Sequence, residues 1–147
     1  MMQKRNSYIL ACMIILLAIA LWFFTMNSTK SLKEVAWNEV DFNTITSIEI
    51  EKGHDQKVTL TNKDDIHKIM SSLSELEVNK DSSISKDFNE VYRLLVDVNG
   101  GARLGMFLYD DKYIDVYDYE ASPKKNTSMK YKISNSFDEK IIHDYLK

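Results

Sequence analysis

The chain has 147 residues and a formal net charge of −3, with one cysteine, four glycines and one proline. This length allows one domain beyond the apolar N-terminal segment. The low glycine and proline content excludes a low-complexity or fibrous chain, and the 11% aromatic content argues against disorder. A mildly acidic chain without a basic stripe is also a poor candidate for binding nucleic acid or anionic lipid headgroups.

An uncharged apolar run begins at Tyr8 and ends at Met26. As a helix with a rise of about 1.5 Å per residue, it would span about 28 Å, close to the hydrocarbon thickness of a bilayer. Tyr8 and Trp22 lie near its two ends, where aromatic residues favour the membrane interface. We therefore expect an uncleaved, single-pass transmembrane anchor with its ends at Tyr8 and Met26.

Three other interpretations of the run fit its residues less well. A buried core helix would carry polar residues on one face, and this run has none. A cleaved signal peptide would use small residues such as Ala18 and Ala20, but these lie inside the run and bulky residues follow them. A lipoprotein signal would place its cysteine after the apolar stretch, whereas Cys12 lies near its beginning. Because Cys12 is the only cysteine, no disulfide is expected.

Lys4 and Arg5 precede the apolar run and all acidic residues follow it, which favours a cytoplasmic N-terminus and a domain outside the membrane. Lys30 and Lys33 on the far side weaken this bias. The lead-in contains Trp37, so part of it is expected to pack on the domain or lie at the membrane interface. The expected organisation is a short cytoplasmic tail and anchor over residues 1–27, a juxtamembrane lead-in over 28–43 and an extracytoplasmic domain over 44–147.

The first part of the domain is expected to be a hairpin followed by a helix. Residues 44–51 alternate, with Ile48 and Ile50 on the apolar face, and residues 57–61 alternate after a turn at 53–55. Asn62 is a good helix N-cap, and apolar residues recur after it at helical spacing up to about Glu77. This helix is expected to lie across one face of the sheet.

A second hairpin is predicted around the turn signal Asn99-Gly100-Gly101. A two-residue loop would pair Val96 with Arg103 and move the side chains of one strand to the wrong face. Burial of the core therefore selects a three-residue loop. The pairs that it implies are Val98 with Ala102, Val96 with Leu104, and Leu94 with Met106.

The rest of the chain is expected to complete the sheet and add a final helix. Ile114 and Val116 extend the second hairpin to a three-stranded meander, and residues 129–133 are a candidate sixth strand. Residues 136–139 read Ser-Phe-Asp-Glu, a capping box that predicts a short last helix. The order β-β-α-β-β-β-(β)-α predicts an α+β fold, with a mostly antiparallel sheet and helices on one face.

The most distinctive stretch covers residues 109–120, which are rich in tyrosine and acidic residues. Tyrosine-rich open faces suit peptide, glycan or protein partners, because the ring is apolar and the hydroxyl forms hydrogen bonds. Two alternatives are that the rings only stabilise the sheet as cross-strand pairs, or that the lead-in or final helix covers them. The candidate binding face, pointing away from the helix, comprises Arg103, Phe107, Tyr109, Tyr113, Asp115 and Tyr117.

The sequence carries no recognised catalytic or cofactor motif. A glycine-rich phosphate loop, HExxH, GxSxG and a cysteine cluster are all absent from it. We therefore expect no cofactor and no enzymatic activity. The three histidines, whose spacing fits no zinc signature, are His54, His67 and His143. The acids that lack the spaced calcium-loop pattern, and are expected to be solvated turn residues, are Asp110, Asp111, Asp115, Asp118 and Glu120.

Four segments carry a resemblance to a known kind of protein. They are ITSIEI at 45–50, TNKDDIHKIMSSLSEL at 61–76, LYDDKYIDVY at 108–117 and YKIS at 131–134. Through them, most of residues 44–134 resembles small membrane-anchored or lipoprotein-like extracytoplasmic proteins of low-GC Gram-positive bacteria, whose domain has no known function. The resemblance implies a location in the cell envelope and no chemistry.

The sequence thus predicts a membrane-tethered extracytoplasmic binding or accessory domain, with a protein, peptide or glycan partner in the envelope. The alternative is a membrane-bound immunity or regulatory protein acting beside an integral membrane partner, in which the anchor itself would carry specificity. An enzyme is the least favoured class, because no constellation of site residues emerges.

Overall fold

The structure is a computed structural model that describes residues 12–22, 29–53, 55–81, 83, 87–120 and 128–147. The strands are β1 (Lys30–Ser31), β2 (Ile45–Lys52), β3 (Gln56–Leu60), β4 (Glu77–Lys80), β5 (Val91–Val98), β6 (Gly101–Tyr109), β7 (Tyr113–Asp118) and β8 (Ser128–Ile133). The helices are α2 (Leu32–Ala36), α3 (Lys63–Ser74) and α4 (Lys140–His143), and 3-10 turns occupy Phe42–Thr44 and Asp144–Leu146.

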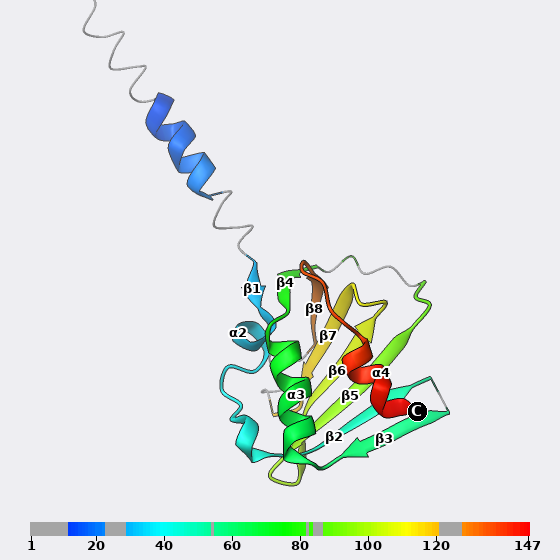
Figure 1. Cartoon of the computed structure of the whole chain (residues 1–147). Coiled ribbons are helices and arrows are strands. Elements are labelled where there is room, and N and C mark those ends of the chain that lie inside the picture. Colours follow the sequence, from blue (N-terminus) through cyan, green and yellow to red (C-terminus); the bar gives the residue numbers. More distant parts are fainter. Residues whose placement is uncertain (1–11, 23–28, 54, 82, 84–86, 121–127) are drawn as a thin grey trace, which may run out of the picture.

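All the described strands form one sheet in the order β1-β4-β8-β7-β6-β5-β2-β3 (Figure 1). Every neighbouring pair in it is antiparallel. This confirms the predicted mostly antiparallel sheet with a few helices. The candidate sixth strand is present as β8, which pairs with β7.

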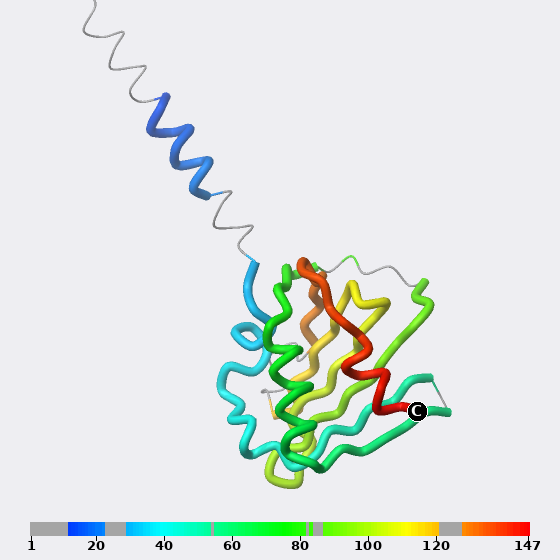
Figure 2. The backbone as a smooth tube through the Cα atoms, viewed as in Figure 1, coloured from blue at the N-terminus to red at the C-terminus, as the bar shows by residue number. Residues whose placement is uncertain are grey.

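The hydrophobic core lies on one face of the sheet, under the helices. Figure 1 shows α3 and α4 on the same side of the strands, and the C-terminal tube in Figure 2 crosses the strands on that side too. Alternate strand residues such as Met106 and Ile114 are fully buried there, together with Ile69 and Met70 of α3. We call this the helix face and the opposite side of the sheet the outer face.

Part of the expected lead-in packs into the same core. Leu32 and Trp37 are 0% and 2% exposed. The indole Nε1 of Trp37 donates a hydrogen bond to Oγ of Ser74 on α3 at 3.3 Å. The lead-in also contributes β1, which pairs with β4 at the edge of the sheet. The lead-in therefore covers part of the helix face.

The predicted three-residue loop of the second hairpin is wrong. Asn99 and Gly100 both have positive φ, at 53° and 84°. They form a two-residue turn that is closed by Val98 and Gly101, so Val98 does not pair with Ala102. Two positive φ values give the turn the twist of the flanking strands, which explains why Asn-Gly adopts it.

The core register is nevertheless as predicted, because a β-bulge corrects it. The register shifts between Val96 and Asp97, which leaves Arg103 as an additional residue on β6. Beyond this bulge, Val96 pairs with Leu104 and Leu94 with Met106, as the sequence predicts. The turn preference and the burial of one face are thus both satisfied.

The end of the first predicted helix and the start of the last one differ from the structure. α3 begins after its predicted N-cap Asn62 but ends at Ser74, because Glu77 opens strand β4. The predicted capping box is also wrong: α4 begins only at Lys140, and the side chain of its N-cap Glu139 makes no capping hydrogen bond. Oδ1 of Asp138 instead accepts the Lys140 N–H at 3.1 Å.

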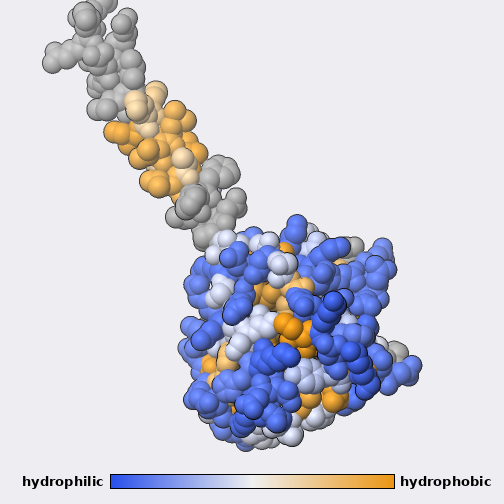
Figure 3. Space-filling view, viewed as in Figure 1, coloured by the Kyte–Doolittle hydropathy of each residue, from blue (hydrophilic) through white to orange (hydrophobic). Residues whose placement is uncertain are grey.

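Residues 12–22 are helical, and their large apolar side chains are 47–66% exposed. Figure 3 shows this helix as hydrophobic, whereas the visible face of the domain is mostly hydrophilic. Among the described residues, no helix has the length and apolar character needed to cross a membrane. The expected ends of the anchor, Tyr8 and Met26, and the cytoplasmic tail lie outside the described residues.

Candidate binding face

The register of β6 and β7 places five of the six predicted residues together on the outer face. Phe107 lies opposite Asp115, and Tyr109 lies opposite Tyr113. Tyr117 lies opposite Gly105, two residues along the same face. Successive side chains of a strand point to opposite faces, and the alternate residues here are the buried core residues. The outer face therefore carries Phe107, Tyr109, Tyr113, Asp115 and Tyr117.

Five half-buried rings contact one another across this face. Phe107 lies 5.8 Å from Tyr117 in an edge-to-face arrangement and 6.3 Å from Tyr109 in a stacked one. Phe88 lies 4.5 Å from Tyr109 and 6.0 Å from Tyr113, measured between ring centroids. We call this set, Phe88, Phe107, Tyr109, Tyr113 and Tyr117, the aromatic row.

Phe88 is held on the face by Asp110, one of the acids considered for calcium. The Asp110 carboxylate accepts the N–H of Glu90 at 2.7 Å and the N–H of Asn89 at 3.0 Å. Asp110 also donates its own N–H to the Glu90 carbonyl. The sequence reasoning missed Phe88, since its only signal is a lone aromatic residue in a polar stretch. Within the described parts of the chain, no three His, Cys, Asp or Glu side chains are grouped to hold a metal ion.

Gly105 makes room for a further ring on the outer face. A Cβ atom at this position would lie 2.9 Å from Oη of Tyr119, so the tyrosine ring lies against the glycine backbone. A glycine inside a strand commonly marks such a close approach. Tyr119 is 54% exposed and was not among the predicted residues.

Arg103, the sixth predicted residue, is occupied by ion pairs. Its guanidinium lies 3.2 Å from the carboxylate of Asp118 and also bonds that of Glu120. Its backbone carbonyl accepts the N–H of Tyr119. Arg103 therefore fixes the end of β7, and two carboxylates already balance its charge.

Asp115 is the buried polar group of the face. It is 3% exposed, and its Oδ1 has no hydrogen-bond partner. Nζ of Lys130 lies 3.8 Å from the other oxygen, Oδ2. Burial raises the pKa of Asp115, and the charge of Lys130 opposes this shift. Burial and the nearby charges of Asp115 and Tyr117 raise the pKa of Tyr109 to about 12.

We expect Asp115→Asn to stabilise the domain at neutral pH by about 1 kcal/mol, because it removes a buried charge that lacks hydrogen-bond donors. A carboxyl whose pKa is raised by folding destabilises the folded state once it ionises. The advantage of the variant should therefore be complete above the folded pKa and disappear as the pH falls below the ordinary value of 3.8. Urea unfolding over this pH range measures it.

Asp111→Asn is the matched control for that experiment, because Asp111 is exposed and undergoes the same change of charge. Its free energy of unfolding should stay within about 0.5 kcal/mol of the wild type at every pH. A pH-independent gain in Asp115→Asn would contradict the proposed cost of the buried charge.

A groove of about 260 Å³ adjoins the aromatic row at Phe107. Arg93 lies opposite Phe107 on β5, and its guanidinium is 3.0 Å from the Glu51 carboxylate. The groove therefore extends the outer face toward β2. The charges of Arg93 and Glu51 in it already balance each other. The residues that line it are Glu51, Gly53, Val91, Arg93 and Phe107.

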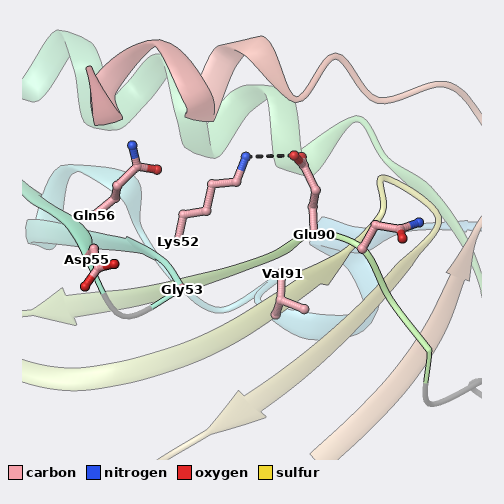
Figure 4. Close-up of a pocket in the computed structure, with 7 residues that line it drawn as sticks. Lys52, Gly53, Asp55, Gln56, Glu90 and Val91 are labelled. Carbon is pink, nitrogen blue, oxygen red and sulfur yellow. Dashed lines mark hydrogen bonds and ion pairs between the residues drawn. The ribbon is translucent and has the colours of Figure 1, made fainter.

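A second, polar pocket of about 550 Å³ lies at the end of β2 (Figure 4). Nζ of Lys52 is 2.9 Å from Oε1 of Glu90 and 3.0 Å from Oη of Tyr92. The hydrogen bonds that Lys52 donates to Tyr92 and Glu90 raise the pKa of Lys52, and the bond to Lys52 lowers the pKa of Glu90. The charges of Lys52 and Glu90 therefore satisfy one another.

The two described histidines have different surroundings. The His67 ring lies at the edge of Phe42, with 6.3 Å between centroids, and His143 lies half-buried on α4 with an Nδ1 that has no partner. His54 lies outside the described residues.

Comparison with known families identifies the family of the chain. The model of the family DUF5301, which carries the description "Domain of unknown function (DUF5300)", matches residues 33–125, well over half of the chain. The chain belongs to the DUF5301 family. The DUF5301 match begins in α2 and includes the whole aromatic row, Asp115 and Tyr119. No curated protein and no solved structure matches the chain.

Proposed function

We propose that this DUF5301 domain is a non-catalytic binding or accessory domain that holds a protein or peptide partner on its aromatic row. The observation that carries the proposal is five contacting, half-buried rings on the side of the sheet opposite the helices. Partly exposed tyrosine rings combine a large apolar contact area with hydroxyl groups at low cost in conformational entropy.

Two features favour binding over sheet stabilisation alone. The lead-in and α4 pack on the helix face, so neither supplies a cover for the aromatic row. The face also contains the buried Asp115 oxygen without a partner, an arrangement that costs stability. Departures from optimal packing of this kind concentrate at functional sites.

The tether is part of the same proposal. The uncharged run from Tyr8 to Met26 is long enough to span a bilayer, and the described part of it, residues 12–22, is helical with exposed apolar side chains. Lys4 and Arg5 before the run favour an N-terminus in the cytoplasm and a domain outside it. A tether would raise the local concentration of the domain near a membrane-bound partner.

The binding proposal is tested by replacing Tyr113 and Tyr117 together with alanine. Crosslinking in intact cells, followed by affinity purification and mass spectrometry, should recover at least tenfold less of the wild-type partner. Each lost aromatic pair costs about 0.5–1.5 kcal/mol, so the domain should remain folded.

Tyr145→Ala is the control for that variant, because Tyr145 is a half-buried tyrosine near α4 whose hydroxyl bonds Asp65 on α3. It should lose a comparable amount of stability and keep full capture. Equal capture by the Tyr113/Tyr117 variant and the wild type would rule out the aromatic row as the binding surface.

The tether is tested by fractionating cells that express the full-length chain. It should remain in the membrane fraction after a high-salt wash, and protease added to spheroplasts should digest the C-terminal part. Deleting residues 1–27 should release the domain from the membrane. Full-length chain in the soluble fraction would contradict the tether, and protection from protease would contradict the proposed sidedness.

A further inference from the structure

The Asp115 carboxylate lacks sufficient hydrogen-bond donors in its described surroundings. An ionised carboxylate accepts several hydrogen bonds, and burying it without them is costly. Oδ1 of Asp115 has no partner, and Lys130 approaches only Oδ2, at 3.8 Å. The Lys130 side chain is 47% exposed, so it neutralises Asp115 incompletely and from the solvent side.

The two arginines near this face are committed to other carboxylates. Arg103 bonds Asp118 and Glu120. Arg93 lies 3.0 Å from Glu51. Breaking either contact to serve Asp115 would leave another carboxylate without its counter-ion. Neither arginine therefore supplies a donor to Asp115. Lys132 lies on the same face, opposite Tyr113 on β8, with its side chain exposed to solvent.

The surroundings of Asp115 suit an ammonium group. Phe107 lies directly across from it on β6, and Tyr113 and Tyr117 flank it on the same face of β7. The faces of aromatic rings attract cations, more strongly where water is excluded. Tyr113 and Tyr117 are only half-buried, so a ligand can reach the rings beside the carboxylate from solvent.

Resting on the function proposed above, we infer that the partner inserts a lysine side chain between the rings of the aromatic row, with its ammonium bound to Asp115. The ammonium supplies the missing donors to Oδ1, and the rings of Phe107, Tyr113 and Tyr117 surround its alkyl stem and charge. The bound ammonium offsets the loss of stability that the buried Asp115 charge causes in the wild-type domain.

The inference is tested with a fluorescein-labelled peptide, Gly-Gly-Lys-Gly-Gly with blocked ends, added to the full-length chain in detergent micelles. Its Nε-acetyl-lysine version has nearly the same shape but no charge. Fluorescence anisotropy should show saturable binding of the lysine peptide and binding at least about tenfold weaker for the acetylated one.

Asp115→Asn should lose at least about tenfold in affinity for the lysine peptide, whereas the exposed control Asp111→Asn should bind as the wild type does. Equal binding of the two peptides, unchanged affinity in Asp115→Asn, or no saturable binding of the lysine peptide would overturn the inference.

Crosslinking in cells separates the two proposals. If Asp115→Asn keeps the captured partner while the Tyr113/Tyr117 variant loses it, the aromatic row binds a partner by another chemistry, and only the lysine inference is wrong. If the Tyr113/Tyr117 variant also keeps the partner, both proposals are wrong. Loss of the partner in both variants supports both.

Discussion

Replacing Trp37 with alanine should lower the free energy of unfolding by about 3–5 kcal/mol. Trp37 is 2% exposed, and its indole lies in the core between the lead-in and α3, with a hydrogen bond to Ser74. The substitution leaves a cavity the size of an indole and removes the partner of a part-buried hydroxyl. Urea unfolding of the full-length chain, followed by near-UV circular dichroism, measures the loss.

Glu39→Ala is the control, because Glu39 is an exposed residue two positions further along the same lead-in. Its effect should stay within about 0.5 kcal/mol. Should Trp37→Ala behave like Glu39→Ala, the lead-in would be a spacer outside the folded domain, and the location of Trp37 in the core would be wrong.

Replacing Asp110 with alanine should cost about 2–3 kcal/mol and release Phe88 from the aromatic row. The Asp110 carboxylate accepts the N–H groups of Asn89 and Glu90, and hydrogen bonds to a charged acceptor are stronger than neutral ones. Asp110 also has a φ of 46°, which alanine adopts with strain.

Asp110→Asn separates these contributions. Asparagine tolerates the left-handed backbone and keeps one carbonyl acceptor, so it should lose about half as much stability. In an NMR spectrum of the full-length chain, the ring protons of Phe88 should move toward random-coil shifts in Asp110→Ala only. Unchanged shifts would show that other contacts hold Phe88 on the face.

Elements with a strong local pattern could be predicted from the sequence. The alternation in 47–51 and 91–98 gives the correct buried faces of β2 and β5, because burial of one side fixes every second residue. At the start of β2 the prediction of Thr46 on the apolar face is wrong: Ile45 is buried and Thr46 exposed, because the register shifts between Ile45 and Ser47. The same parity argument places Phe107, Tyr113 and Asp115 on the outer face. For the helix after Asn62, the N-cap and the apolar spacing agree, and the structure contains that helix as α3.

Elements that depend on distant partners could not be predicted. β4 has one buried residue, Val78, and exists because its backbone pairs with β8, more than fifty residues away. The β-bulge at Arg103 is a second example. The Asn-Gly turn favours a two-residue loop, whereas burial of the apolar face favours the other register. The sequence does not show that a bulge satisfies both preferences. The prediction of the capping box is wrong because Phe137 is buried in the core and lies before the first turn of α4.

The candidate site was predictable in its location and not in its chemistry. Alternation shows that Asp115 shares a face with tyrosines, but its burial depends on how the rings pack over it. The hydrogen bonds between Asp110 and residues 89 and 90 hold the backbone next to Phe88 at this face. Tyr119 does so through the space left by Gly105. These contacts join separate segments, so no single sequence pattern contains them.

The most direct test of partner binding on the outer face is photocrosslinking from single positions in intact cells. A benzophenone amino acid at Tyr117 should form a covalent adduct with a defined partner, and the same group at the exposed Ser71 on α3 should not. Adduct from Tyr117 alone is the result that the outer-face proposal predicts. Adduct from Ser71 with none from Tyr117 would place binding on the helix side and contradict it.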